Sequence, residues 1–185
     1  MTTILPPLVL DKIFIVDFDD SFTYNIASVV YPEEKSCVVI RHDVFFRDYF
    51  PLMKKIKSRH AVILGPGPGH PEEYREYFSD IARLLDNESI YVLGICLGHQ
   101  ILGMVKNLEI REVKNKIHGE SVEINFFGKF CNVQRYNSLG VFEGPKELIS
   151  LQFSRGISYQ FHPESIGTDD NLTFFLELLK FVHQG

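Results

Sequence analysis

The chain has 185 residues, 45% of them hydrophobic and 23% charged, a composition typical of a soluble globular protein with one sizeable core. Its formal net charge is −5 and the charges are interleaved, so the sequence offers no basic face for a nucleic acid or an anionic membrane. Its three cysteines, Cys37, Cys96 and Cys131, lack metal-ligand spacing, which predicts a cytoplasmic protein without a disulfide framework or a metal site.

Residues 1–11 are predicted to form an irregular arm that precedes a single domain over residues 12–185. The arm contains the apolar stretch ILPPLVL, but it has no basic leader and is interrupted by Pro6 and Pro7. We therefore expect neither a signal peptide nor a membrane span there.

Short apolar runs alternate with amphipathic ones through residues 12–95. Strands are predicted for KIFIVDF (12–18), SCVVIRH (36–42), HAVILG (60–65) and IYVLGI (90–95). Helices are predicted from about Ser21, around 47–58 and around 72–86. Because this alternation is typical of βαβ units, we predict an α/β fold with a mixed, largely parallel central sheet and helices on both faces.

Beyond residue 109 the pattern changes to short runs separated by Gly and Asn. The runs are EIREVK, ESVEINFF, FCNVQRY, ELISLQF and ISYQFHP. We expect them to add antiparallel strands to the same sheet or beside it. A closing helix with an N-cap is predicted from Asp169 onward, because its apolar residues fall on one face. These residues are Leu172, Phe175, Leu176, Leu179 and Val182.

Cys96 lies between Gly94 and Gly98, where the fourth predicted strand gives way to a helical pattern. A strand that turns sharply into a helix strains its corner residue and needs small residues two before and two after it. The corner side chain then projects beside free N–H groups, that of Leu97 included, which favour a thiolate and can hold an oxyanion. The alternative interpretation is a buried cysteine whose glycine neighbours serve only packing.

A cysteine nucleophile needs a base, and His162 is the best candidate among the seven histidines. It ends the run ISYQF and is followed by Pro163 and Glu164. Proline stiffens this stretch, so the side chains of His162 and Glu164 can lean to the same side, where the carboxylate fixes the imidazole tautomer. The alternative is an ordinary strand end.

The stretch GPGPGHP (65–71) directly follows the third predicted strand. It is a poor phosphate cradle, because the sequence has no G-x-x-x-x-G-K-[ST] pattern. At the carboxyl end of a parallel strand its glycine N–H groups are well placed to face a ligand crevice. Either this loop shares a site with Cys96, or it is only a rigid turn.

Together the stretches LGPGPGHP, GICLGHQ and QFHPES, in this order, resemble the class I, triad-type glutamine amidotransferases from about Ile13 to the end. DFDDSFTYNI (17–26) and RYNSL (135–139) are similar to segments of the glutaminase subunits of anthranilate synthase and aminodeoxychorismate synthase. The resemblance implies that family's fold, L-glutamine as substrate and a chorismate-binding synthase subunit as partner in a heteromer. It implies no metal or organic cofactor for glutamine hydrolysis.

The resemblance also implies roles for individual residues. It makes Cys96 the nucleophile, His162 the acid and base, and Glu164 the carboxylate that orients His162. The oxyanion hole is implied to use N–H groups of the Gly67/Gly69 loop and of the residue after the nucleophile. The implied substrate-binding residues are Gly67, Gly69, Leu97, Gln100, Ser138 and Leu139.

The sequence departs from the family pattern outside the proposed triad. Phe18 stands where the family usually has Asn, and Asn137 where it usually has His; the stretch from Phe127 to Pro163 is also short. These departures bear on the identity of the partner more than on glutamine hydrolysis. A stand-alone cysteine hydrolase and a regulatory pseudoenzyme are the competing hypotheses. The sequence does not choose between anthranilate and aminodeoxychorismate as the product.

Overall fold

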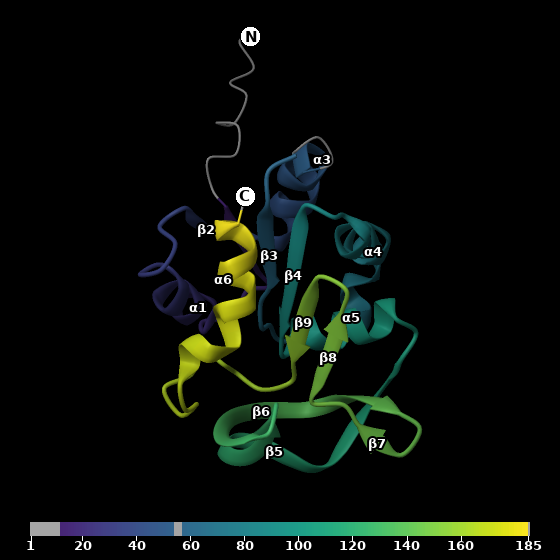
Figure 1. Cartoon of the computed structure of the whole chain (residues 1–185). Coiled ribbons are helices and arrows are strands. Elements are labelled where there is room, and N and C mark those ends of the chain that lie inside the picture. Colours follow the sequence, from purple (N-terminus) through teal and green to yellow (C-terminus); the bar gives the residue numbers. More distant parts are fainter. Residues whose placement is uncertain (1–11, 54–56, 185) are drawn as a thin grey trace.

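The computed structural model describes residues 12–53 and 57–184, so the arm expected over residues 1–11 lies outside the described residues. Its central sheet has the strand order β2-β1-β3-β4-β9-β8 (Figure 1). All neighbouring strands run parallel except β8, which is antiparallel to β9. This confirms the predicted α/β fold. The strands are β1 (Ile13–Asp17), β2 (Cys37–Arg41), β3 (His60–Leu64), β4 (Ile90–Ile95), β8 (Ser150–Phe153) and β9 (Gly156–Tyr159).

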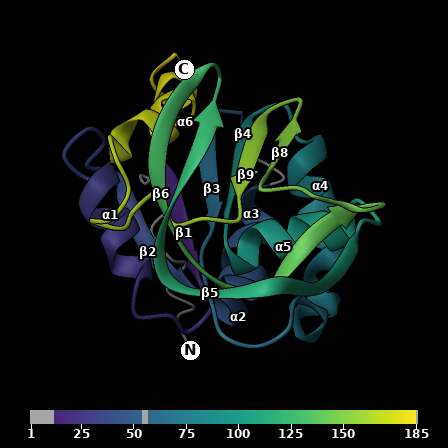
Figure 2. The ribbon, with the colours of Figure 1, turned by 90° about the horizontal axis from the view of Figure 1, so that it is seen from below.

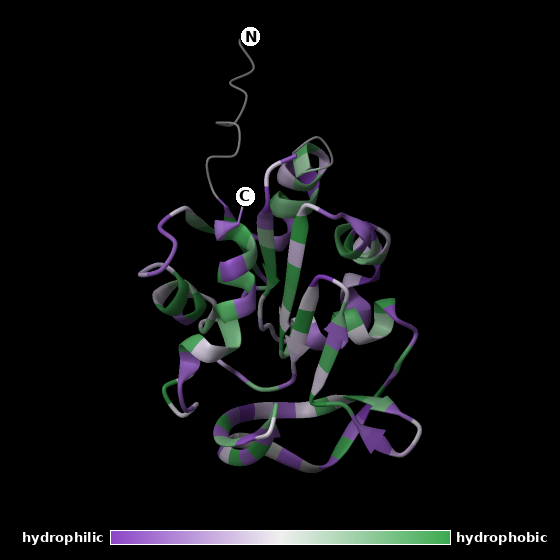
Figure 3. Ribbon diagram, viewed as in Figure 1, coloured by the Kyte–Doolittle hydropathy of each residue, from purple (hydrophilic) through white to green (hydrophobic). Residues whose placement is uncertain are grey.

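Helices cover both faces of this sheet, as the alternation of side chains along β1 shows. Ile13 and Ile15 pack in one core with α1 and α6, while Phe14 and Val16 pack in a second core with α3, α4 and α5. The strands at the centre of the sheet are accordingly drawn mostly in green, the colour of hydrophobic residues, in Figure 3. The helices are α1 (Thr23–Val30), α2 (His42–Val44), η1 (Phe45–Tyr49), α3 (Phe50–Met53), η2 (Pro71–Tyr77), α4 (Phe78–Asp86), α5 (Leu97–Val105), η3 (Asn171–Phe175) and α6 (Leu176–His183).

Two predicted helices begin differently in the structure. The helix expected around 47–58 begins at His42, because Phe45 and Phe46 extend its buried face toward β2. The helix expected around 72–86 opens with the 3₁₀ turn η2, in which His70 and Glu73 form a capping box. The sequence therefore located both helices, but it missed the early start of the first and the 3₁₀ form of the second. It also extended the first helix too far, because Lys57 and Ser58 are not helical.

The closing helix departs more from its prediction. Its first turn, η3, is a 3₁₀ helix with three residues per turn, which moves Leu176 from the predicted apolar face to the surface. Asp170 precedes η3, but its side chain makes no capping bond to the backbone. Leu179 and Val182 are buried as predicted. No helix within the described ranges is long and apolar enough to cross a membrane.

A second, three-stranded antiparallel sheet, here called the ribbon, consists of β5 (Glu109–Phe126), β6 (Lys129–Glu143) and β7 (Lys146–Glu147). The runs EIREVK and ESVEINFF, expected as separate strands, form one strand with register shifts before and after His118. Such irregularities bend a strand without ending it. The ribbon lies across the carboxyl ends of the parallel strands (Figures 1 and 2), and an isolated antiparallel bridge pairs its Gln134 with His162 in the stretch after β9.

The run ISYQFHP was expected among the antiparallel strands. This is correct for its pairing with β8 but wrong for its pairing with β4. Its first half, β9, lies between β4 and β8 and pairs parallel with β4. Both faces of β9 are buried, which is the environment of an interior parallel strand. The stretch that follows β9 therefore ends at the same edge of the sheet as β4.

Candidate active site

Cys96 occupies the sharp corner predicted between β4 and α5. Its backbone is strained, with φ 51° and ψ −98°. A Cβ atom at Gly98 would lie 2.1 Å from Leu64 O, and one at Gly94 would lie 2.6 Å from Leu102 Cδ1. Both positions therefore need glycine, because the strand, the corner and the helix approach too closely for a side chain.

His162 and Glu164 form a buried pair next to this corner. Nδ1 of His162 and Oε1 of Glu164 are 2.7 Å apart, and only 3% of His162 is exposed. Burial lowers the pKa of His162, but interactions with Cys96 and Glu164 outweigh it and raise this pKa well above its usual value. Nε2 is buried without a hydrogen-bond partner among the described residues, so it is available for proton transfer.

Two aromatic side chains enclose the histidine. The ring of Tyr136 is perpendicular to the ring of His162 at a centroid distance of 5.4 Å, and the ring of Phe22 lies at 5.8 Å. The carbonyl oxygen of Tyr136 also lies 4.0 Å from Cys96 Sγ. Cys96 is consequently only 8% exposed, and the reacting atoms are shielded from water in this state.

The GPGPGHP loop lies against the start of α5. A Cβ atom at Gly67 would lie 2.5 Å from Leu97 Cδ2 and 2.6 Å from Phe18 Cβ, so only glycine permits this approach. Gly69 has a positive φ of 85°. The N–H groups of Gly67 and Leu97 have no hydrogen-bond acceptor among the described residues, which leaves both able to bind a ligand oxygen.

Phe18, which departs from the family pattern, belongs to the core beneath this loop. It is fully buried and stacks on His42 at a centroid distance of 5.4 Å, and its ring meets Tyr74 of η2 edge-on at 4.8 Å. Phe18 therefore supports the loop by packing.

Gln100 connects α5 to the ribbon. Its Nε2 atom donates to the carbonyl oxygen of Leu139 at 2.9 Å, and Ser138 is the adjacent residue of β6. Asn137 donates to the same carbonyl at 2.9 Å and accepts a hydrogen bond from buried Arg135, which pairs with Glu147. Thus Asn137, the second departure from the family pattern, fixes the main chain at Leu139.

The structure brings Cys96, His162, Glu164, Leu97, Gly67, Gln100 and Leu139 together at the carboxyl ends of the parallel strands, while Gly69 lies against Glu73 and Ser138 makes no hydrogen bond to the other predicted site residues. It also adds polar side chains that the sequence analysis missed. Ser158, Gln160 and His162 occupy every second position of β9 and the stretch after it, and Ser158 and Gln160 contact residues of α5. Ser158 binds Nδ1 of His99 at 2.8 Å, and Nε2 of His99 donates to Leu148 O at 2.8 Å. Burial lowers the pKa of His99 to about 4, so this ring is neutral. The sequence did contain a signal for these residues, because polar residues occupy every second position of ISYQFHP.

Comparison with known proteins identifies the family. The sequence matches the glutamine amidotransferase class-I family over residues 14–181. It is 29% identical to anthranilate synthase component 2 of Archaeoglobus fulgidus, covering 94% of this chain and 99% of that protein. It is 31% identical to the bifunctional protein TrpGD of Thermotoga maritima and to an aminodeoxychorismate synthase of Streptomyces griseus, over 88% and 86% of this chain.

The chain spans 31% and 24% of these two longer relatives. Among solved structures, a glutamine amidotransferase from Thermotoga maritima superposes with a TM-score of 0.60 at 19% identity, covering 92% of this chain and 82% of that one. The family match spans both the Cys96 corner and the His162–Glu164 pair. The chain is therefore a glutamine amidotransferase, a member of the class-I family.

Proposed function

We propose that this chain is a glutaminase subunit that hydrolyses L-glutamine through Cys96, His162 and Glu164 and passes ammonia to a chorismate-using synthase subunit. One observation carries the proposal. The N–H of Cys96 donates to Tyr159 O at 2.9 Å, so the corner after β4 is joined to the stretch after β9 that holds His162. Residues distant in sequence thereby form one buried nucleophile–base–carboxylate set.

The first half-reaction forms a thioester. The thiolate of Cys96 attacks the side-chain amide carbon of glutamine, and the resulting oxyanion binds the N–H groups of Leu97 and Gly67. His162 then donates its proton to the leaving nitrogen, the C–N bond breaks, and ammonia departs. Glu164 holds the imidazole in place and stabilises its charged form.

The second half-reaction restores the enzyme. Water gives a proton to His162 and attacks the thioester carbon, after which the C–S bond breaks and glutamate leaves. Gln100 and the main chain at Ser138 and Leu139 hold the glutamine in both halves. The central sheet thus provides the nucleophile and the base, and Gln100 together with the ribbon provides the groups that bind the substrate.

The names of the relatives support a synthase partner. They include an anthranilate synthase component and an aminodeoxychorismate synthase, and the proposal covers the chemistry shared by both products, the amination of chorismate. The free thiols of Cys96 and Cys131 fit a reducing, cytoplasmic location. Identifying the synthase that co-purifies with this chain from its own cell distinguishes the two products.

Docking of the synthase is proposed to complete the site. The N–H of Gly67 has no acceptor among the described residues, so a small shift of the Gly67 loop on docking is expected to aim this N–H at the oxyanion. Losing one oxyanion donor costs roughly a hundred- to a thousandfold in rate. The isolated chain should therefore release glutamate slowly, and the complex with chorismate should release it much faster.

The test uses the reconstituted complex with two nitrogen sources. His162→Ala should abolish product formation from glutamine and leave product formation from ammonium unchanged, because the acceptor chemistry lies on the synthase. The stand-alone hydrolase hypothesis instead requires full-rate hydrolysis of another substrate by the lone chain. Glutamine turnover by His162→Ala at the wild-type rate, or loss of the ammonium reaction as well, contradicts the proposal.

A further inference from the structure

Gln160 is a buried glutamine that lies directly beside the proposed nucleophile. Tyr159, the last residue of β9, pairs with Ile95, the last residue of β4. The residues that follow these two strands, Gln160 and Cys96, are therefore neighbours. The backbone N–H of Gln160 donates to Ile149 O at 2.9 Å, and the residue is 0% exposed. Its side chain is therefore held in the site and has no access to solvent.

The orientation of the Gln160 amide follows from its two contacts. Its Oε1 atom accepts from Nε2 of Gln100 at 3.3 Å, and its Nε2 atom lies 3.8 Å from Cys96 Sγ. The Gln100 amide group that makes this contact also donates to Leu139 O, so it is the donor in both contacts. Gln160 must then use its oxygen toward Gln100, which leaves its NH₂ group facing the sulfur.

We propose that Gln160 donates a hydrogen bond to the sulfur of Cys96, stabilising the thiolate, while its oxygen holds Gln100 in position to bind glutamine. This inference rests on the proposed role of Cys96 as the nucleophile. A neutral amide donor stabilises an anionic sulfur more than a neutral one, so it increases the fraction of thiolate. The same bond assists the sulfur as leaving group when the thioester is hydrolysed.

The alternation along this stretch gives each polar side chain a separate task. Ser158 binds His99, Gln160 binds Cys96 and Gln100, and His162 binds Glu164. Tyr159 and Phe161, which point to the opposite side, belong to the hydrophobic core. Both polar atoms of the Gln160 side chain are engaged, as buried polar atoms must be, and one of the two partners is the sulfur of the proposed nucleophile.

Two substitutions separate the two tasks of Gln160. Gln160→Leu removes both hydrogen bonds while nearly conserving volume. Gln160→Glu keeps an oxygen for Gln100 but places a carboxylate where the donor was, which repels the thiolate. Gln152→Leu, at an exposed glutamine on the neighbouring strand β8, is the matched control.

The readout is the rate at which iodoacetamide alkylates Cys96 as a function of pH, with the site of alkylation mapped by mass spectrometry. Loss of the donor should move the midpoint of this profile upward by about one pH unit. At a pH below the midpoint, this corresponds to a roughly tenfold lower fraction of thiolate and a roughly tenfold slower alkylation. Gln160→Glu should move it at least as far, and Gln152→Leu should not move it.

The outcomes are distinguishable from failure of the proposed function. If the wild-type chain is alkylated elsewhere and not at Cys96, the nucleophile assignment fails, and the inference fails with it. If Cys96 is alkylated but Gln160→Leu does not move the midpoint, only the role of Gln160 is overturned. Should Gln160→Leu not fold, Gln160→Met, which also lacks a hydrogen-bond donor and carries no charge, takes its place. An upward shift in the profile with Cys96 as the labelled residue supports the inference.

Discussion

The central sheet and the ribbon contribute to the same site in different ways. The sheet positions the side chains of Cys96 and His162 at the ends of buried parallel strands, where the backbone is fixed on both sides. The ribbon contributes main-chain carbonyls, those of Tyr136 and Leu139, and its far end is exposed, with Phe127 83% accessible. Under the proposed function, the rigid sheet therefore carries the covalent chemistry, and the ribbon helps to bind the substrate.

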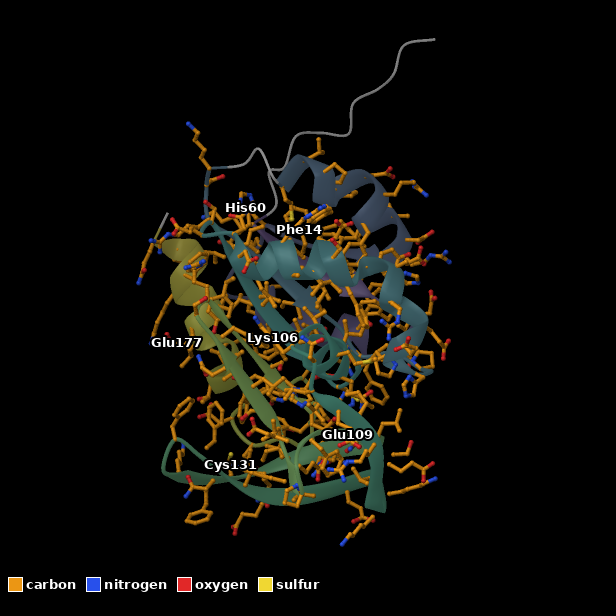
Figure 4. The ribbon with its side chains drawn as sticks, turned by 90° about the vertical axis from the view of Figure 1, so that its right-hand side faces the viewer. Phe14, His60, Lys106, Glu109, Cys131 and Glu177 are labelled. Atoms are coloured by element: carbon orange, nitrogen blue, oxygen red, sulfur yellow. The ribbon has the colours of Figure 1, made fainter. Side chains whose placement is uncertain are left out.

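The sharpest way to break this comparison is to remove a cysteine from each region. Cys96→Ala should lower glutamate release by at least about a thousandfold, because the nucleophile is lost. Cys131 lies on the ribbon (Figure 4), and Cys131→Ala should change the rate by less than about twofold. Steady-state glutamate release with the synthase present measures both, and a comparable loss in the two variants contradicts the division of tasks.

Glycines of the two regions give a second contrast, in stability. Gly98→Ala places a Cβ atom 2.1 Å from the backbone oxygen of Leu64, which cannot yield, and should cost about 3 kcal/mol of unfolding free energy. Gly128→Ala, in the turn of the ribbon, meets no atom within 4 Å and should cost about 1 kcal/mol of backbone strain. Urea unfolding measures both values, and equal costs would show that the corner relaxes freely.

Acid should destabilise the sheet side through His99. Its pKa is about 4 in the folded protein against an ordinary 6.5, so the unfolded chain binds the proton first as pH falls. Stability should therefore decrease between these two pH values by about 3 kcal/mol, and His99 adds no pH dependence above them. His99→Gln should flatten this part of the curve, measured by urea unfolding at several pH values. An unchanged slope contradicts a neutral, buried His99.

The smallest effect is expected on the ribbon, at Asn137. Asn137→Ala removes one of the two donors to Leu139 O. The KM for glutamine should rise about three- to tenfold because the carbonyl is held less firmly, while kcat changes by less than about twofold. Initial rates against glutamine concentration separate the two constants. A fall in kcat at constant KM would contradict this, because it would show that the ribbon contributes to the chemical step.

Sequence patterns predicted the sheet side of the molecule well, because its signals are local. The glycines around Cys96 mark a corner that the structure contains, and the alternation of apolar runs is typical of the βαβ units that are observed. Gln160 was missed because its importance depends on register. Only the pairing of Tyr159 with Ile95 reveals that it neighbours Cys96.

The ribbon was harder to predict. Its strands contain both polar and apolar residues, visible as alternating colours in Figure 3. Bulges interrupt the two-residue alternation that marks a strand in a sequence. A register shift cannot be read from a two-residue pattern, so one long strand was expected as two. The supporting role of Asn137 likewise depends on Arg135 and Glu147, which come together only when β6 and β7 pair.

The central claim, that Cys96 is the nucleophile at the corner of the sheet, is tested most directly by covalent labelling. A glutamine-mimicking electrophile such as 6-diazo-5-oxonorleucine should modify the chain once at neutral pH, and peptide mapping should place the label on Cys96. Glutamine added in excess should slow this labelling, because both compounds occupy the same site. Label on Cys37 or Cys131 with Cys96 untouched would contradict the account.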